Sequence, residues 1–198
     1  MKARHKPAQH GVIMLIVLVA LGVLLAAAVA LVRSSDVFQR QSGNLAFRRD
    51  LQNQAERGVK TAVTLLSSGY LSTDSLRYTT NTSYNYSAVQ LTSDAHGIPT
   101  ALLSDTAFTA AGKTSNDITD SDTGVTVRWV IDRQCVSTLE GAAFTTAGCT
   151  TISSGTTDAS ADSRHKSVNA SRMPVYRISV LASGPHNTQL FMQATVVR

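Results

Sequence analysis

The sequence contains few of the residues and motifs from which catalytic and nucleic-acid-binding sites are usually built. Its 198 residues include two cysteines, five histidines and one tryptophan, and its only glutamates are Glu56 and Glu140. The many serines form no GxSxG or SxxK motif, and no histidine has a partner at metal-ligand spacing. No patch of basic and aromatic residues indicates nucleic-acid binding. We therefore predict a protein that is not an enzyme, needs no cofactor and binds no nucleic acid.

Charge is also missing from one long apolar run. Residues 12–32 read VIMLIVLVALGVLLAAAVALV, and these 21 residues would form a helix roughly 31 Å long, which matches the hydrocarbon core of a bilayer. The alternative is a cleaved secretory signal, whose apolar region has only about 7 to 15 residues and ends at small residues. Ala26, Ala27, Ala28 and Ala30 would meet that second condition. Because the run is longer than a signal needs, we predict a transmembrane helix over 12–32.

The charges around this run do not determine its orientation. Three basic residues precede it, and four follow within the distance over which the positive-inside rule applies. Both cysteines and almost all of the sequence rich in Ser and Thr come after the run, which favours an exported C-terminal part. We therefore expect a cytoplasmic N-terminus, a single membrane span and a periplasmic C-terminal domain.

The two cysteines, Cys135 and Cys149, are 14 positions apart. In an oxidising compartment a bridge between them would close a 15-residue loop and contribute about 3 kcal/mol in the chain-entropy model. Two free thiols are an alternative, and half of a metal site is another, although no second CxxC and no nearby pair of histidines would complete four ligands. A disulfide is the prediction that the compartment favours.

A helical pattern continues beyond the apolar run, over residues 33–68. Apolar residues recur there at spacings of three and four, which predicts one apolar stripe on an amphipathic helix. Ser42, Gly43 and Asn44 interrupt the pattern and predict a softened or kinked point, because Gly costs about 1 kcal/mol relative to Ala inside a helix. Ser67-Ser68-Gly69 predicts its end. The stripe consists of Phe47, Leu51, Ala55, Val59, Ala62 and Leu66.

After residue 69 the hydrophobic period changes to that of β-structure. Val125, Val127, Trp129 and Ile131 alternate with polar residues, which predicts a half-buried strand over 125–132. Residues 175–181 and 190–197 predict a C-terminal hairpin, and residues 84–91 a weaker strand. Residues 92–124 and 140–173 have no sustained period and read as loops. We therefore expect an α+β protein with a β-rich exported domain over 69–198.

One acidic cluster precedes the strand that begins at residue 125. Asp120 and Asp122 have the alternating spacing of calcium loops, but Gly124 stands one position early and Ile131 occupies the twelfth position, where an EF-hand needs Glu. The two aspartates are therefore only weak metal candidates. A solvated turn leading into the strand is the better interpretation.

A basic leader that ends in Gly11, an apolar helix directly after it, an amphipathic continuation and a C-terminal β-domain together resemble the type IV pilins over the whole chain. Within that superfamily the sequence is most similar to PilX-type minor pilins, through GVIMLIVLVA at residues 11–20 and SGNLAF at residues 42–47, followed by QAE at residues 54–56. The resemblance implies a leader over 1–11, cleavage between Gly11 and Val12, and N-methylation of Val12. It also implies a long N-terminal helix packed on an antiparallel β-sheet domain.

Ile16 departs from the major pilins, which carry a glutamate at this fifth mature position to pair with the amino terminus of a neighbouring subunit. A subunit without that carboxylate avoids the cost of a charge in the membrane but cannot form the pair. The resemblance therefore implies a low-abundance minor pilin that helps to initiate assembly at or near the filament tip. Small residues would let its helix approach neighbouring helices closely. These small residues include Ala20, Gly22, Ala26 and Ala27.

The resemblance also implies partners and a location. The partners would be other minor and major pilins, the prepilin peptidase, the inner-membrane assembly platform and a tip adhesin. The protein would reside in the bacterial inner membrane before it enters the pilus at the cell surface. Two alternatives remain, a minor pseudopilin of type II secretion and a single-pass anchored periplasmic binding domain that keeps its leader.

Overall fold

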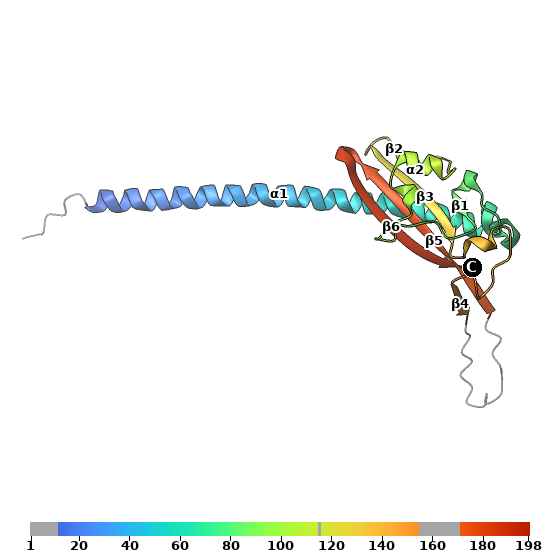
Figure 1. The fold of residues 1–198 in the computed structure, drawn as a ribbon. Helices are drawn as coiled ribbons and strands as arrows, with labels where there is room; N and C mark the ends of the chain where they lie inside the picture. Colours follow the sequence, from blue (N-terminus) through green and yellow to red (C-terminus); the bar gives the residue numbers. More distant parts are fainter. Residues whose placement is uncertain (1–11, 115, 155–170) are drawn as a thin grey trace, which may run out of the picture. The chain divides into compact units, whose positions relative to one another are not determined.

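A computed structural model describes residues 12–114, 116–154 and 171–198 (Figure 1). Contacts within the chain divide it into two units, residues 1–48 and 49–198, which are described separately. Helix α1 (Val12–Ser67, 56 residues) contributes to both. The described part of the first unit, residues 12–48, is helical throughout, and all of its side chains except the half-buried Phe47 are exposed.

The helix continues without interruption through Ser42, Gly43 and Asn44. The predicted kink is therefore wrong. A single Gly costs only about 1 kcal/mol relative to Ala, and each residue that extends an existing helix adds a backbone hydrogen bond. The residues on either side favour the helix enough to outweigh that cost.

The second unit contains a six-stranded sheet with the central order β1, β3, β5, β4. Strand β2 also pairs with β3, and β6 pairs with β5. Most pairs are antiparallel, but β1 lies parallel to β3, so the sheet is mixed and the expectation of a purely antiparallel sheet is wrong. The strands are β1 (Tyr86–Ser87), β2 (Ile118–Asp120), β3 (Val125–Arg133), β4 (Thr151–Ser154), β5 (Ser171–Gly184) and β6 (Thr188–Val197).

One further α-helix and several short 3₁₀ helices connect the strands. Helix α2 lies within the region expected to be a loop, so that expectation is wrong there. The helices are α2 (Asp105–Ala110), η1 (Tyr70–Ser72), η2 (Asp74–Arg77), η3 (Thr82–Tyr84), η4 (Thr100–Leu102), η5 (Ser137–Leu139) and η6 (Pro185–Asn187).

The C-terminal half of α1 packs on one face of the sheet. In strand β3 the four predicted residues, at positions 125, 127, 129 and 131, are all buried as expected. A Cβ atom added to Gly58 would lie 2.8 Å from Val127 Cγ1 and 3.0 Å from Val180 Cγ1, so only glycine permits this close approach. Gly58 therefore takes the buried position in the apolar stripe that was predicted for Val59, and Val59 is only half-buried. The buried helix residues are Leu51, Ala55, Gly58, Ala62 and Leu66.

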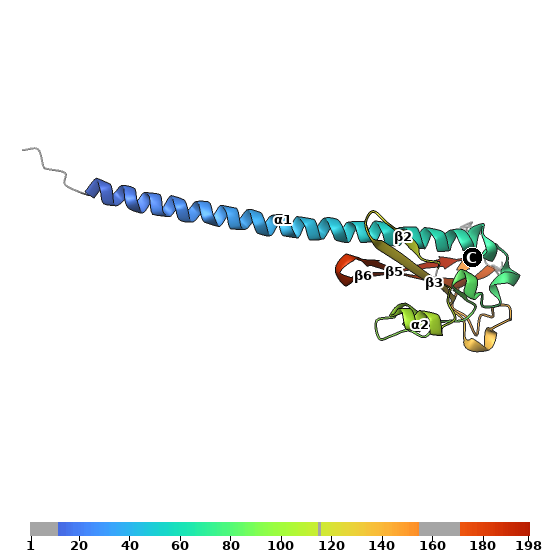
Figure 2. The ribbon, with the colours of Figure 1, turned by 90° about the horizontal axis from the view of Figure 1, so that it is seen from above.

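Helix α2 covers the other face of the sheet, so the second unit has three layers (Figure 2). Side chains alternate between the two faces of a strand, which places Val130 of β3 and Leu181 of β5 on this second face. Both belong to a buried cluster with Leu102 and Phe108, against which Leu91 and Phe191 also pack. The sheet is thus buried on both sides of its central strands.

The C-terminal hairpin is confirmed, but its first strand is longer than predicted. Strand β5 begins at Ser171 rather than at residue 175, and the extra residues pair with β4, in a region that was expected to be a loop. The expected strand over 84–91 is reduced to the two residues of β1, after the 3₁₀ turn η3. Short strands of this kind form through pairing with distant residues, which local periodicity does not reveal.

Candidate functional site

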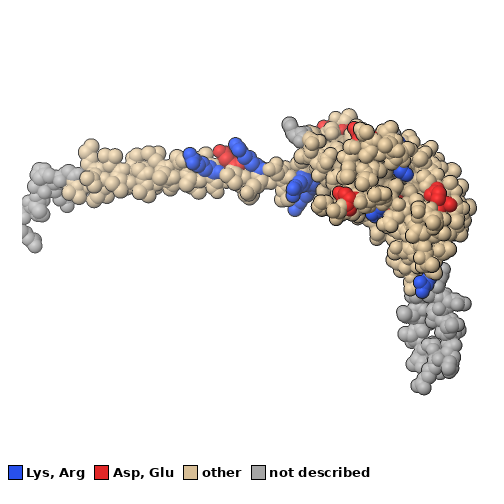
Figure 3. Space-filling model, in the orientation of Figure 1, with Lys and Arg blue, Asp and Glu red and all other residues tan. Residues whose placement is uncertain are grey.

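The first candidate site is the apolar surface of α1 in the first unit. Among the described residues, α1 is the one helix long and apolar enough to cross a membrane, judged by length and composition. Val12 and Ile16 are 64% and 59% exposed. The space-filling view shows the start of the helix without charged residues, followed by Lys, Arg, Asp and Glu side chains farther along (Figure 3). Gly11, at the predicted cleavage point, lies outside the described residues.

The four small residues expected to mediate helix packing do not form one stripe. Successive residues of an α-helix are about 100° apart, so Ala20 and Ala27 lie within about 20° of each other. Gly22 and Ala26 are about 40° apart, on a face rotated by more than about 100° from the first pair. An added Cβ at Gly22 would meet no atom within 4 Å. The helix therefore offers two faces for close packing.

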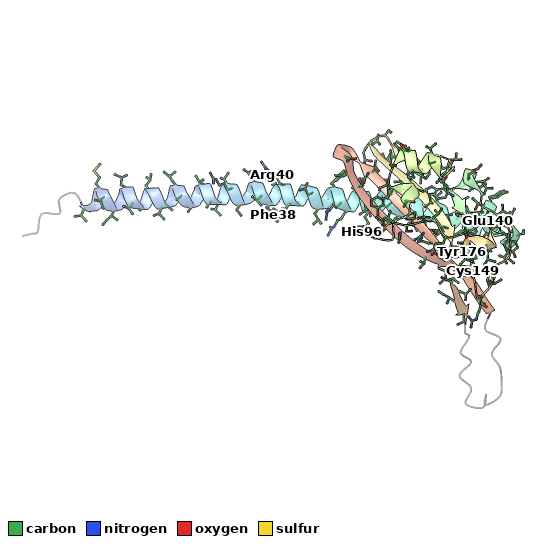
Figure 4. The ribbon with its side chains drawn as sticks, in the orientation of Figure 1. Phe38, Arg40, His96, Glu140, Cys149 and Tyr176 are labelled. Carbon is green, nitrogen blue, oxygen red and sulfur yellow. A yellow bond between two sulfur atoms is a disulfide. The ribbon has the colours of Figure 1, made fainter. Side chains whose placement is uncertain are left out.

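Apolar exposure continues beyond residue 32. Val37 and Leu45 are exposed, and Phe38 is 72% exposed. Phe38 and Arg40 project from opposite sides of the helix (Figure 4). Phe38 and Leu45 lie within about 20° of each other around the helix, so exposed apolar residues persist on one side after charged residues have returned.

The second unit contains a disulfide between Cys135 and Cys149 (Figure 4), so the predicted bridge is confirmed. It follows directly after strand β3, and backbone hydrogen bonds continue the connection. Val136 N donates to Gly148 O at 2.8 Å, and Thr150 N donates to Gln134 O at 2.8 Å. The bridge thus closes residues 136–148 into a loop held against the end of β3.

The buried side chain of Arg133 holds this loop in place through hydrogen bonds. Its side chain is buried, with 1% of the residue exposed. Its guanidinium donates to backbone carbonyls, at 2.7 Å to Ala88 O, 2.8 Å to Leu139 O and 3.1 Å to Ala142 O. Sequence reasoning missed this residue, for which the only signal was a basic residue at the end of an apolar strand. Its contacts give it a structural role.

Asp132 and Arg177 form an ion pair between neighbouring strands β3 and β5. Arg177 Nη2 lies 2.7 Å from Asp132 Oδ2, and its Nε lies 3.0 Å from Oδ1. Arg177 also donates to Ser93 Oγ at 3.0 Å and to Gly97 O at 3.3 Å. Asp132 is fully buried and accepts the backbone N–H of Leu91 at 3.0 Å. The pair therefore holds the loop of residues 91–97 against the sheet, a role that the sequence did not reveal.

Arg128 joins α2 to the loop before β2. Its Nη2 donates to Asp117 at 2.7 Å, its Nε donates to both oxygens of the same carboxylate at 3.1 and 3.2 Å, and its Nη1 donates to Asp105 at 2.6 Å. Its guanidinium lies over the Phe108 ring, 4.4 Å from the centroid. The hydrogen bonds to Asp117 are the main reason that the pKa of Arg128 is raised, so the side chain stays charged. A cavity of about 470 Å³ lies beside it, lined in part by Leu102, Leu181 and Asn187.

Asp120 holds a turn against α1 within the second unit. Its carboxylate accepts the backbone N–H of Asp122 at 3.1 Å and the Gln54 side chain at 3.0 Å, and lies 3.5 Å from Arg57. Hydrogen bonds from the backbone of Thr123 and Asp122 hold the pKa of Asp120 below its usual value. The predicted turn into β3 is present, with Gly124 at a φ of +66°. In the described part of the chain, no three His, Cys, Asp or Glu side chains are grouped to hold a metal ion.

The fold and these contacts define a class of protein. The chain is an α+β protein with one N-terminal helix suited to single-pass membrane anchoring and a mixed-sheet domain with a disulfide. Comparisons with protein-family models, with curated proteins and with solved structures find no match to this chain.

Proposed function

We propose that the chain is a minor pilin of a type IV pilus, a structural subunit that helps to initiate assembly and sits at or near the filament tip. The observation that carries this proposal is the continuity of α1. The described helix covers Val12 to Ser67 without a break and exposes an apolar first half. From Leu51 onward one side of the helix is buried, through Leu51, Ala55, Gly58, Ala62 and Leu66.

In this function the prepilin peptidase removes residues 1–11, and the new amino terminus of Val12 is N-methylated. The helix over 12–32 holds the subunit in the inner membrane until the assembly platform extracts it. It then packs among the helices of other minor and major pilins. Two faces with small residues support such packing, because close backbone approach drives helix association where no water is present.

The absence of a carboxylate at Ile16 supports a position at the start of the filament. In the proposed function, a tip subunit has no neighbour above it whose amino terminus would need a partner. An apolar residue there also avoids the cost of placing a charge in the bilayer. A filament has few such positions, so a subunit that occupies them would be a low-abundance minor pilin and not the bulk subunit.

The construction of the second unit supports a domain displayed outside the cell. The disulfide and the internal hydrogen bonds of Arg133 and Arg177 hold its long loops without metal ligands among the described residues. Such a domain would contact other minor pilins or present an adhesin. Its disulfide suits an oxidising compartment.

Leader processing provides the test. The full chain is expressed in cells with and without the prepilin peptidase, and intact-protein mass spectrometry identifies its first residue. We expect N-methylated Val12 only where the peptidase is present. Gly11→Glu should block processing, whereas the matched control Gln9→Glu, which places the same charge inside the leader, should not. An uncut leader in the presence of the peptidase would refute the proposal and favour an anchored binding domain.

A further inference from the structure

Strand β6 forms one edge of the sheet and has a free side. It pairs with β5 in regular register over ten residue pairs, from Thr188 opposite Gly184 to Val197 opposite Val175. No other strand or bridge of the described chain pairs with it. The backbone N–H and C=O groups along its outer side therefore have no strand partner in the described structure.

This edge lacks the features that usually protect exposed strands. Its sequence, TQLFMQATVV, contains no charged residue, no proline and no glycine. The regular register leaves no place for a β-bulge. Exposed edges are normally kept short, charged or interrupted, because a long bare edge is a template for another strand.

The opposite edge of the same sheet is built differently. It consists of β1 and β2, two and three residues long, which pair with separate parts of β3. Arg128 lies on β3 between these two paired segments, with its ion pairs to Asp117 and Asp105. Short strands and charge thus occupy that edge, and only β6 offers ten continuous residues.

Strand β6 is also held in place before any partner arrives. The side chain of Gln193 donates to Gly97 O at 2.7 Å, and Phe191 packs against the buried cluster of Leu102, Phe108, Val130 and Leu181. Arg198 donates to Ser67 O at 3.0 Å just beyond the strand. Pairing with β5 holds one edge of the strand, and the contacts of Phe191 and Gln193 hold one of its faces. A partner that adds to the other edge therefore meets a preformed template.

The side chains of β6 indicate what an added strand must look like. Leu190, Met192, Ala194 and Val196 share the face that α1 covers, since they stand opposite Ala182, Val180, Ile178 and Tyr176. Gln189, Gln193 and Thr195 are exposed on the other face. A matching strand carries apolar residues at alternate positions and uncharged polar residues between them.

A second copy of this chain is a poorer occupant. Antiparallel pairing of two β6 strands needs a two-fold axis perpendicular to the sheet. That axis would reverse the direction of residues 51–66 of α1, which lie along one face of the sheet (Figure 2). Residues 51–66 of the two copies would then run in opposite directions across one continuous sheet.

We propose that the outer side of β6 receives an extended, uncharged segment of a second polypeptide, which pairs with residues 188–197 as an additional strand. Backbone hydrogen bonds supply the affinity, and alternating side chains set the register. The proposal concerns the second unit and does not require that the partner be a pilin. It goes beyond the proposed function, and leader processing does not depend on it.

The test uses the full chain in detergent micelles and a synthetic peptide as the probe. The peptide copies residues 175–184, the strand that already pairs with β6, with Thr in place of Arg177. Amide hydrogen exchange is followed by mass spectrometry. We expect exchange in residues 188–197 to slow by roughly tenfold once the peptide reaches ten times its dissociation constant. A peptide with prolines at two central positions should have no effect.

Variants of the chain show whether this protection depends on the edge. Thr195→Lys places a charge on β6 and should abolish most of the protection, whereas the control Thr138→Lys, at an exposed residue of η5, should retain it. Equal protection in both variants, or none with saturating peptide, would overturn the proposal. Slow exchange without peptide at the β6 amides that face away from β5 would also overturn it, since the chain itself or, if the effect grows with protein concentration, a second copy would then occupy the edge.

Discussion

The apolar helix of residues 12–32 and the domain of residues 49–198 use their side chains in opposite ways. In the first region every side chain is exposed and none is charged. In the second, charged groups such as Asp132 and Arg133 are buried and satisfied inside the domain. The difference shows that these buried charges find their partners inside the domain, whereas the helix needs a membrane or other helices to cover it.

Removing one member of the buried ion pair should have the largest effect on the domain. Arg177→Met leaves the fully buried Asp132 carboxylate without its cation, and we expect a loss of about 3–5 kcal/mol in the free energy of unfolding. Denaturant titration followed by Trp129 fluorescence measures it. Arg172→Met, the same change at an exposed position of β5, is the control and should be nearly neutral. Equal losses in both variants would contradict the role given to the pair.

Removing the disulfide should have the next largest effect. The double variant Cys135→Ser and Cys149→Ser should lose about 3 kcal/mol, because the unfolded chain regains the freedom of the closed loop. Reduction of the native protein should produce the same shift in the denaturation midpoint. Neither change should alter the helix of the first unit, whose circular-dichroism signal should remain after the domain has unfolded. A domain with unchanged stability after reduction would show that the loop is held by Arg133 alone.

The same substitution at two glycines of α1 compares the two regions directly. Gly58→Ala places a methyl group 2.8 Å from Val127 Cγ1, and we expect a loss of about 1–3 kcal/mol. Gly43→Ala meets no atom within 4 Å and should instead stabilise the helix by up to about 1 kcal/mol. Thermal unfolding of both variants gives the signs. Changes in stability of the same sign would show that Gly58 and Gly43 do not lie in differently packed surroundings.

The smallest effect concerns the turn before β3 and depends on pH. Because the folded pKa of Asp120 is lowered, its contribution is present above the ordinary value of 3.8 and is lost as the pH falls through the folded pKa. Asp120→Asn should therefore be less stable than the native protein at pH 7, and the difference should vanish in acid. Asp122→Asn is the control, because it keeps the backbone N–H that Asp120 binds and should therefore leave the stability at pH 7 nearly unchanged. If the free energies of unfolding of the native protein and of Asp120→Asn stay equally far apart down to acid pH, the carboxylate of Asp120 does not have this role.

Long periodic patterns were sufficient to predict much of the architecture. The 56-residue helix, strand β3 and the C-terminal hairpin all follow from patterns that repeat over many residues. The disulfide followed from the exported composition of the chain. In these elements local preference and tertiary packing agree.

Features that depend on distant residues were not predicted. Gly58 is buried because β3 and β5 approach it, and β1 pairs in parallel with a strand 45 residues later. The ion pair of Asp132 and Arg177 could not be predicted, because each residue alone is a single charge in an apolar strand. Only the pairing of the two strands shows why either charge is buried. The predicted cleavage at Gly11 and Val12 and the role of Ile16 remain predictions, because chemistry outside the folded domain decides them.

The composition of surface filaments tests the central claim most directly. Filaments sheared from the cells are purified, and quantitative mass spectrometry measures how much of this chain they contain and which residue begins it. The account predicts a few copies per filament, each starting with N-methylated Val12, and loss of the chain from the filaments when Gly11→Glu blocks processing. Filaments that lack the chain, while the protein remains in the membrane with residues 1–11 attached, would contradict it.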